Sequence, residues 1–384
     1  MKDTPKRPRI TVGDLVATAD RAANFMSAAR NTMLKPEIVK TPPNLTSQQL
    51  ADLVGLNKDQ FNYRLNKGGL PEGTRGPGGR RHFSLEEARE WAKEYRKEFL
   101  RPEGGRAVCC AVANFKGGVA KTTTTMTLAQ GFSLKGHKVL MIDCDPQASL
   151  TLLCGWLPNI DVGEDDSLVP ALLEQGSIKE AIRATYWPGI DLVAGCSGLF
   201  GAEMYLPARQ RKDSKYEFWN VLNLIIEEVR DDYDIILLDT APALSYLTIN
   251  AMIAADGLIV PLPPTNLDFA SASQFWYLFS DFMEKLIASG SLQKSYDFIH
   301  VLMTKVDTSA VSTNVVSSWI NAMYGQMVLP VEIPETIVAK NSAVYFGTVY
   351  DVPQRKVREA YERVNDVIEQ SIRISWSEQL SMGV

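Results

Sequence analysis

The sequence has 384 residues, of which 45% are apolar and 22% are charged, and its formal net charge is −5. The length exceeds that of one typical core and predicts two or three domains. No stretch approaches the roughly 18 uncharged residues of a membrane span, and the start, MKDTPKRPRITV, lacks the apolar core of a secretory signal. These features argue against a membrane-spanning or secreted protein, and we expect the chain in the cytoplasm.

Charge is unevenly distributed along the chain. Residues 1–100 hold 18 Lys/Arg and 12 Asp/Glu, whereas the remaining residues are acidic overall. A basic N-terminal segment is consistent with nucleic-acid binding, although an ordinary solvated surface explains its charge as well. The five cysteines form no CxxC pair, which favours buried free thiols, and the three scattered histidines have no metal-ligand spacing.

Residues 11–34 place apolar side chains at steps of three and four, which predicts an amphipathic helix. Its apolar stripe needs a partner, either the next domain or a second copy of the chain, and the sequence does not decide between them. The proline-rich stretch KPEIVKTPPN then predicts a linker. We therefore expect residues 1–40 to form a helix and linker with a possible dimerisation role.

Residues 45–71 have the pattern of a helix-turn-helix. Thr46 followed by Gln49 is the spacing of a capping box, Gly55 turns the chain, and a second helix begins near Asn57. Phe61 and Leu65 are expected in the core of this domain. A Gly- and Arg-rich hairpin follows, and then a helix capped by Ser84.

This order resembles the winged helix-turn-helix of MerR-like regulators and predicts a DNA-binding domain at 41–103. In such a domain the second helix faces a DNA groove and the wing contacts phosphates. The expected DNA contacts are Lys58, Gln60 and Arg64 in the helix and Arg75, Arg80 and Arg81 in the wing.

From residue 104 onward, short apolar runs alternate with helical periods. The runs predict strands at 106–114, 137–143, 190–194, 234–239, 257–262, 298–304 and 327–332. Continuous apolar strands with helical crossovers indicate an α/β fold, a parallel sheet with helices on both faces. LRPEGG at 100–105 reads as the hinge into this second domain, which would span 104–384.

KGGVAKTTTT at 116–125 lies between the first of these strands and a helix, the context of a phosphate-binding loop. Lys121 would neutralise the β- and γ-phosphates, and the Thr122 hydroxyl would ligate Mg²⁺. The expected nucleotide-binding residues of this loop are Lys116, Gly117, Gly118, Val119, Ala120, Lys121, Thr122 and Thr123.

The loop departs from the common Walker pattern because Ala120 stands where a glycine precedes the lysine. A methyl group is accommodated there if the local φ is negative. Read as KGGxxK[ST]T, the loop resembles the deviant Walker A family, in which two subunits sandwich two nucleotides and the first lysine reaches the partner's phosphates. On this resemblance Lys116 acts in trans, much as an arginine finger does.

Two further segments complete the predicted site. VLMIDCDPQASLTLL delivers Asp143 and Asp145 at the end of a strand, where open parallel sheets bind ligands, and DDYDIILLDT delivers Asp239 in the same way. The first resembles the A′ motif of ParA-type ATPases, in which Asp145 would orient the attacking water. The second matches a Walker B strand, so we expect Thr122, Asp143 and Asp239 at Mg²⁺ and assign catalysis to Lys116, Lys121 and Asp145. Pro334 and Thr336 lie where relatives contact the adenine, although packing explains them nearly as well.

Together these motifs resemble a large ParA-type partition ATPase over nearly the whole chain. The resemblance implies ATP and Mg²⁺ as cofactors, an ATP-dependent homodimer on nonspecific DNA of the nucleoid, a ParB-type partner that stimulates hydrolysis, and operator binding that represses the protein's own operon. Candidates for nonspecific DNA contact are Lys340, Arg355, Lys356 and Arg358, for which a solvated helix face is an equally good explanation.

Two alternatives remain open at this point. The chain could be a transcriptional repressor whose nucleotide domain only senses ATP with little turnover, although Asp145 argues against that. A MinD-like membrane protein would end in a basic amphipathic helix, whereas residues 357–380 have mixed charge and predict a helix packed on the sheet, so we expect no membrane binding.

Overall fold

A computed structural model of the chain describes residues 11–33, 40–335, 347–351 and 355–382. The chain divides into two compact units, residues 1–41 and 42–384. Within the described residues, no helix combines the length and apolar character needed to cross a bilayer. The predicted boundaries at 40/41 and 103/104 stay predictions; we call residues 42–103 the front module and residues 104–384 the body.

The first unit contains one helix, α1 (Val12–Met33), as the periodicity predicts. Thr11 and Asp14 exchange hydrogen bonds at its start: the Thr11 backbone N–H donates to Asp14 Oδ2 over 2.7 Å. Val12, Leu15 and Val16 are more than half exposed. The apolar stripe that called for a partner is therefore accessible.

The front module contains three short α-helices, each started by a side chain that satisfies free N–H groups. Its elements are β1 (Leu45–Thr46), α2 (Ser47–Leu53), α3 (Lys58–Lys67), β2 (Thr74–Arg75), β3 (Arg81–Phe83) and α4 (Leu85–Tyr95). The predicted capping box of Thr46 with Gln49 is present, and Asn57 and Ser84 begin α3 and α4 in the same way. The three strands pair antiparallel in the order β1-β3-β2.

The core of the front module is aromatic. The ring centroids of Phe61 of α3 and Trp91 of α4 lie 4.8 Å apart, and both rings contact Phe83 of β3. Phe61 is buried and Leu65 packs against the same cluster, so the core assignment of these two residues is confirmed. The Trp91 indole N–H donates to the carbonyl of Pro71, which satisfies its one polar group.

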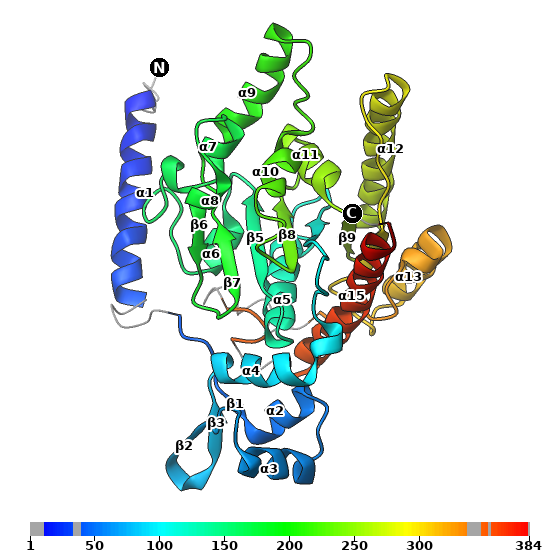
Figure 1. The fold of residues 1–384 in the computed structure, drawn as a ribbon. Helices are drawn as coiled ribbons and strands as arrows, with labels where there is room; N and C mark the ends of the chain where they lie inside the picture. The colour runs from blue at the N-terminus through cyan, green and yellow to red at the C-terminus, as the bar shows by residue number, and fades with distance from the viewer. Residues whose placement is uncertain (1–10, 34–39, 336–346, 352–354, 383–384) are drawn as a thin grey trace. The chain divides into compact units, whose positions relative to one another are not determined.

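The body is built on a seven-stranded sheet of order β10-β9-β4-β8-β5-β7-β6 (Figure 1). Its strands are β4 (Val108–Val112), β5 (Val139–Cys144), β6 (Ile182–Ala184), β7 (Ile190–Val193), β8 (Ile235–Thr240), β9 (Gly257–Leu262) and β10 (Phe298–Met303). Neighbouring pairs run parallel except β6, which pairs antiparallel with β7. The predicted α/β class and six of the seven predicted strands are confirmed.

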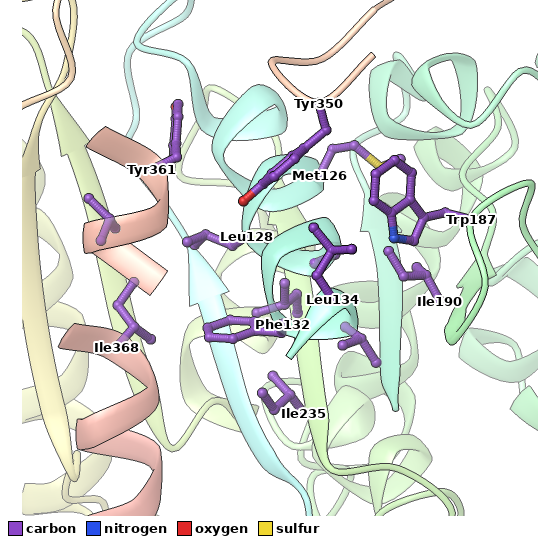
Figure 2. Close-up of a cluster of buried hydrophobic side chains, with 14 of the residues drawn as sticks. Met126, Leu128, Phe132, Leu134, Trp187, Ile190, Ile235, Tyr350, Tyr361 and Ile368 are labelled. Atoms are coloured by element: carbon purple, nitrogen blue, oxygen red, sulfur yellow. The ribbon is translucent and has the colours of Figure 1, made fainter. Parts of the chain in front are cut away.

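Helices cover both faces of this sheet. They are α5 (Lys121–Leu134), α6 (Ser149–Leu153), α7 (Val169–Leu172), α8 (Ile178–Ala181), α9 (Leu199–Lys212), α10 (Val221–Glu227), α11 (Tyr246–Ala254), α12 (Asn266–Ala288), α13 (Val311–Tyr324) and α15 (Arg355–Met382). Alternate strand residues face α5 and α15 on one side and α10, α11 and α12 on the other. Figure 2 shows the first side, with Phe132 of α5, Ile235 of β8 and Ile368 of α15 in one cluster. The predicted packing of the C-terminal helix on the sheet is confirmed.

Two sheet predictions need correction. No strand forms at 327–332; this segment carries a 3-10 turn (Gly325–Met327) and one isolated bridge from Val328 to Val301. The backbone N–H groups of Leu329 and Ile333 donate to the carbonyls of Val301 and Met303 of β10, so the segment runs beside β10 without the regular register of a strand. β6, an edge strand of three residues, was not predicted.

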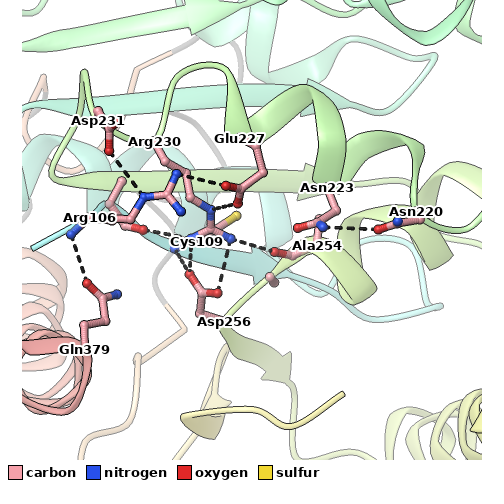
Figure 3. A network of polar contacts seen from close by, with 12 residues as sticks. Arg106, Cys109, Asn220, Asn223, Glu227, Arg230, Asp231, Ala254, Asp256 and Gln379 are labelled. Atoms are coloured by element: carbon pink, nitrogen blue, oxygen red, sulfur yellow. Dashed lines mark hydrogen bonds and ion pairs between the residues drawn. The ribbon is translucent and has the colours of Figure 1, made fainter. Parts of the chain in front are cut away.

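Ion pairs fix the edge of the sheet where the strands begin (Figure 3). Arg230 donates to both carboxylate oxygens of Asp256 and to the carbonyl of Ala107. The backbone N–H of Cys109 also donates to Asp256, over 2.7 Å. All five cysteines are buried, as expected, and burial raises the pKa of Cys109 to about 12.

The front module is anchored to the C-terminal end of α5. Arg89 of α4 donates to the carbonyl of His137 over 2.8 Å and to the hydroxyl of Ser133 over 2.7 Å. Arg96, which ends α4, holds both carboxylate oxygens of Glu369 of α15. Cations at a helix C-terminus complement its dipole, so these arginines seat the module on the body at the end of α5 opposite the loop 116–120.

Candidate nucleotide site

A cavity of about 670 Å³ lies where β4, β5 and β8 end, the edge at which parallel sheets bind ligands. Eight predicted site residues line it: Gly117, Gly118, Ala120, Lys121, Thr122, Thr123, Asp145 and Pro334. Val119 is buried beneath the loop. Thr336 lies outside the described residues.

The loop between β4 and α5 has the geometry expected of a phosphate cradle. Gly118 has φ 76°, a conformation that glycine adopts without strain. Lys121 is the first residue of α5, and its ammonium donates to the carbonyl of Lys116 over 3.0 Å. Burial lowers the pKa of Lys121, while Asp239 and Asp145 act in the opposite direction. The cation therefore lies in a desolvated position where a polyphosphate would displace the carbonyl.

The backbone of Ala120 does not have the conformation that would accommodate its methyl group without strain. Its φ is 76°, in the left-handed region, so the condition of a negative φ, under which the methyl group is accommodated without strain, is not met. The residue is the N-cap of α5, where the loop turns into the helix.

We expect Ala120→Gly to stabilise the protein by about 0.5 to 1 kcal/mol, because a non-glycine residue pays a steric cost of that order in this conformation. Urea unfolding of the nucleotide-free protein measures the change. Ala148→Gly is a useful comparison, since Ala148 has φ 52° at the start of α6. A loss of stability in Ala120→Gly would contradict the strain argument.

Lys116 is one-third exposed, and its ammonium lies 2.8 Å from a carboxylate oxygen of Asp268. Asp268 is in the first turn of α12, where its other oxygen accepts the hydroxyl of Thr265 over 2.6 Å. Within one chain, then, the signature lysine pairs with the start of α12. Whether it reaches a second subunit stays a prediction.

Two carboxylates lie opposite each other on adjacent strands, Asp143 of β5 beside Asp239 of β8. Burial raises the pKa of Asp143 to about 6 and that of Asp239 to about 8, and Asp143 adds to the shift at Asp239. Asp239 Oδ1 accepts a hydrogen bond from Thr125 over 3.3 Å, while Oδ2 is buried and has no hydrogen-bond partner among the described residues. A buried acid with an open oxygen is suited to a cation or to water bound to one.

Asp143 also holds the loop that carries Asp145. Its Oδ2 accepts from the backbone and the hydroxyl of Thr151, and its Oδ1 accepts from the backbone of Asp145. Thr151 was not predicted as a site residue, although it follows Asp143 by only 8 residues in the sequence. The bonds fix Asp145 at the wall of the cavity, which it lines.

Thr122, Asp239 and Asp143 thus fit Mg²⁺ chemically, because hydroxyl and carboxylate oxygens beside a phosphate site are its usual ligands. The Thr122 side chain lowers the pKa of the Asp239 carboxyl against the dominant effect of burial.

The far wall of the cavity comes from the loop after β10 and from residues 333–335. Val306 donates its backbone N–H to Ile333 over 3.0 Å and accepts from Glu335 over 3.0 Å. Pro334 lies between them and lines the cavity. Lys305, from the same loop, has its ammonium 2.5 Å from the carbonyl of Gly118. Sequence reasoning missed this contact because 187 residues separate the two positions.

The predicted DNA contacts of the front module lie on its surface. Lys58, Gln60, Arg75 and Arg80 are exposed, whereas Arg64 and Arg81 are half-buried. Arg64 reaches toward the carbonyl of Gly68, and Arg81 pairs with Glu72. Tyr63, also on α3, is 71% exposed and was not predicted to contact anything.

The body residues proposed for nonspecific DNA begin α15. Arg355 and Arg358 form ion pairs one turn along the helix with Glu359 and Glu362. Lys356 is exposed, and Lys340 lies outside the described residues. The paired glutamates reduce the positive charge that Arg355 and Arg358 present, which favours the solvated-face interpretation for these two.

Residues 107–294 match a family model described as an AAA domain. The chain is 30% identical to the protein SopA of Escherichia coli K12 over 362 residues, which is 89% of this chain and 92% of SopA. It is also 30% identical to the chromosome partitioning protein ParA of Caulobacter vibrioides over 230 residues, 59% of this chain and 80% of that protein.

Two solved structures resemble the chain. One, titled "Partition Protein", superposes with a TM-score of 0.68 over 94% of this chain and 98% of its own, at 21% identity, which shows a shared fold. The other is cobyrinic acid a,c-diamide synthase from Mycobacterium smegmatis with a bound ATP analogue and magnesium, with a TM-score of 0.55, 27% identity, and coverage of 68% and 94%.

The fold and the loop at 116–125 define a P-loop protein of the α/β class. The similarity extends over 92% of SopA, and this identifies a family within the class of P-loop proteins. The chain belongs to the family of ParA-type partition ATPases.

Proposed function

We propose that the protein is a Mg²⁺-dependent ATPase that segregates DNA, forming a homodimer on ATP and responding to a ParB-type partner. The observation that carries the proposal is the meeting of Lys121, Asp145 and Asp239, from three distant segments, beside one phosphate loop. The magnesium-bound ATP analogue in the similar synthase supports ATP and Mg²⁺ as the ligands.

Each side chain has a separate task in this proposal. The loop N–H groups and Lys121 bind and orient the polyphosphate. Thr122 and Asp239 would hold Mg²⁺, with Asp143 in support, and the ion would supply neutralisation of the charge that develops on the phosphate groups. Asp145 accepts a hydrogen bond from the attacking water and aligns it with the γ-phosphorus.

The DNA-directed part of the proposal rests on the front module and on the accessible apolar stripe of α1. Lys58, Arg75 and Arg80 are exposed cations on neighbouring elements, α3 and the β2–β3 hairpin, suited to phosphate contact. Binding of operator DNA by this surface would repress the protein's own operon. Val12, Leu15 and Val16 of α1 offer a surface for a second copy.

Steady-state ATP hydrolysis tests the proposal. We expect turnover of the wild-type protein to rise at least about tenfold when nonspecific DNA and a ParB-type protein are added together. Hydrolysis that stays at its basal rate would instead favour the nucleotide-sensing repressor.

We expect Asp145→Asn to lower stimulated hydrolysis about a hundredfold while ATP affinity changes little, since a general-base or water-aligning side chain contributes about that much. The amide keeps the size of the side chain but cannot accept a proton. Isothermal titration with a nonhydrolysable ATP analogue and a phosphate-release assay separate the two effects. If binding and turnover fell together, Asp145 would be part of the binding surface rather than a residue that acts on water.

A further inference from the structure

Two residues of the loop after β10 donate hydrogen bonds to the backbone of the phosphate loop. Thr304 is fully buried, and its hydroxyl donates to the carbonyl of Val119 over 3.1 Å. The next residue, Lys305, donates its ammonium to the carbonyl of Gly118. Two consecutive residues thus bind two consecutive carbonyls of the loop.

These carbonyl contacts have a consequence for the N–H groups of the loop. A loop binds an anion when successive N–H groups turn inward, which requires the carbonyls of the same peptides to turn outward. An outward carbonyl needs its own donor. Thr304 and Lys305 supply donors for the carbonyls of Val119 and Gly118, and so hold the two peptides that carry the N–H groups of Ala120 and Val119.

The backbone of Lys305 is itself in an uncommon conformation. Its φ is 53°, one of five positive values at non-glycine residues in the described part of the chain. Such residues cost energy and persist where surrounding contacts hold them. Here Val306 provides those contacts, because it is hydrogen-bonded on both sides to residues 333–335 of the cavity wall. Hydrogen bonds therefore connect residues 333–335 of the cavity wall to Val306, and the adjacent Lys305 to the phosphate loop.

We propose that Lys305 and Thr304 are positioning residues that keep the phosphate loop in its anion-binding form before a nucleoside di- or triphosphate arrives. The proposal rests on the proposed function, because it needs the cavity to bind a nucleotide. Both residues also line the cavity, but the proposed role rests on their contacts to loop carbonyls and does not require them to touch the phosphates. Because the phosphate loop already has its binding conformation, less free energy is spent on ordering it, and the nucleotide binds more tightly.

The test uses two variants of the full-length protein that remove the two donors separately. Lys305→Met keeps the length of the side chain and removes its charge, whereas Thr304→Val removes a hydroxyl without changing charge. We expect each to bind ATP about tenfold more weakly in isothermal titration, the scale of one lost hydrogen bond. We also expect faster amide hydrogen exchange at residues 117–121 in the nucleotide-free proteins.

Matched variants separate positioning from charge and from misfolding. Lys305→Arg and Thr304→Ser restore a donor and should recover affinity to within threefold of wild type. Lys285→Met removes the same charge from an exposed site on α12, where Lys285 pairs with Asp281, and should leave affinity unchanged.

Three results would overturn the inference. The first is wild-type affinity and unchanged exchange in both variants. The second is a loss confined to Lys305→Met that high salt abolishes, which would assign the effect to through-space attraction. The third is failure of both donor-restoring variants to recover binding. If the wild-type protein itself bound no ATP, the proposed function would fail instead, and the two failures are thus distinguishable.

Discussion

Lys116→Ala should bind ATP with an affinity within about threefold of wild type, yet lose ATP-dependent dimerisation and about a thousandfold in stimulated hydrolysis. A cation supplied across a subunit interface stabilises the transition-state charge on the γ-phosphate by that order. Lys121 remains in each subunit to hold a single nucleotide. Sedimentation with and without ATP, together with a phosphate-release assay, measures both effects.

The ion pair with Asp268 provides the control for this variant. A partly exposed pair contributes at most about 1 kcal/mol, so Asp268→Asn should retain ATP-dependent dimerisation. If Asp268→Asn reproduced every defect of Lys116→Ala, the lysine would serve only the start of α12 in its own subunit.

Mixing two inactive variants tests the action in trans directly. In a mixed dimer of Lys116→Ala and Lys121→Ala, the first subunit can hold ATP and the second can offer its Lys116. Part of the stimulated activity should therefore return on mixing. A mixture that stays as inactive as its components would contradict transfer of the lysine between subunits.

The sequence was sufficient for the regular elements because the physics there is local. Strands with uninterrupted apolar runs, such as 257–262, were placed correctly, and so was the capping box at Thr46. The apolar run at 327–332 was wrongly predicted as a strand, because apolar composition alone does not show whether a segment keeps the regular hydrogen-bond register of a strand. β6 has three residues, too few for any periodicity.

The site was only partly predictable, for a different reason. Motif spacing located Lys121, Asp145 and Asp239, since each follows a strand of one parallel sheet. The partners of these loops come from far along the chain: Asp268 meets Lys116, and Lys305 meets Gly118. Such pairings depend on tertiary packing, and so does the sign of φ at Ala120.

Glu369→Gln should cost about 3 to 5 kcal/mol, because it leaves buried cations without their counter-charge. The Glu369 carboxylate accepts from Arg96 of the front module, from Lys135 at the end of α5 over 3.0 Å, and from His137 over 2.8 Å. Urea unfolding at pH 7 measures the loss. Glu362→Gln, on the same helix but in a half-exposed pair with Arg358, should cost less than about 1 kcal/mol.

The pH dependence of stability supplies a second measurement on the same residue. Burial acts to raise the pKa of Glu369, but the hydrogen bond from His137 and the charges of Lys135 and Arg96 outweigh it and hold the pKa at about 2. A depressed pKa stabilises the fold above the unfolded value, near 4.3, and this stabilisation is lost as the pH falls toward 2. Wild type should therefore lose stability between pH 5 and 3 more steeply than Glu369→Gln. Parallel curves for the two proteins would show that this carboxylate is not what holds the front module to the body.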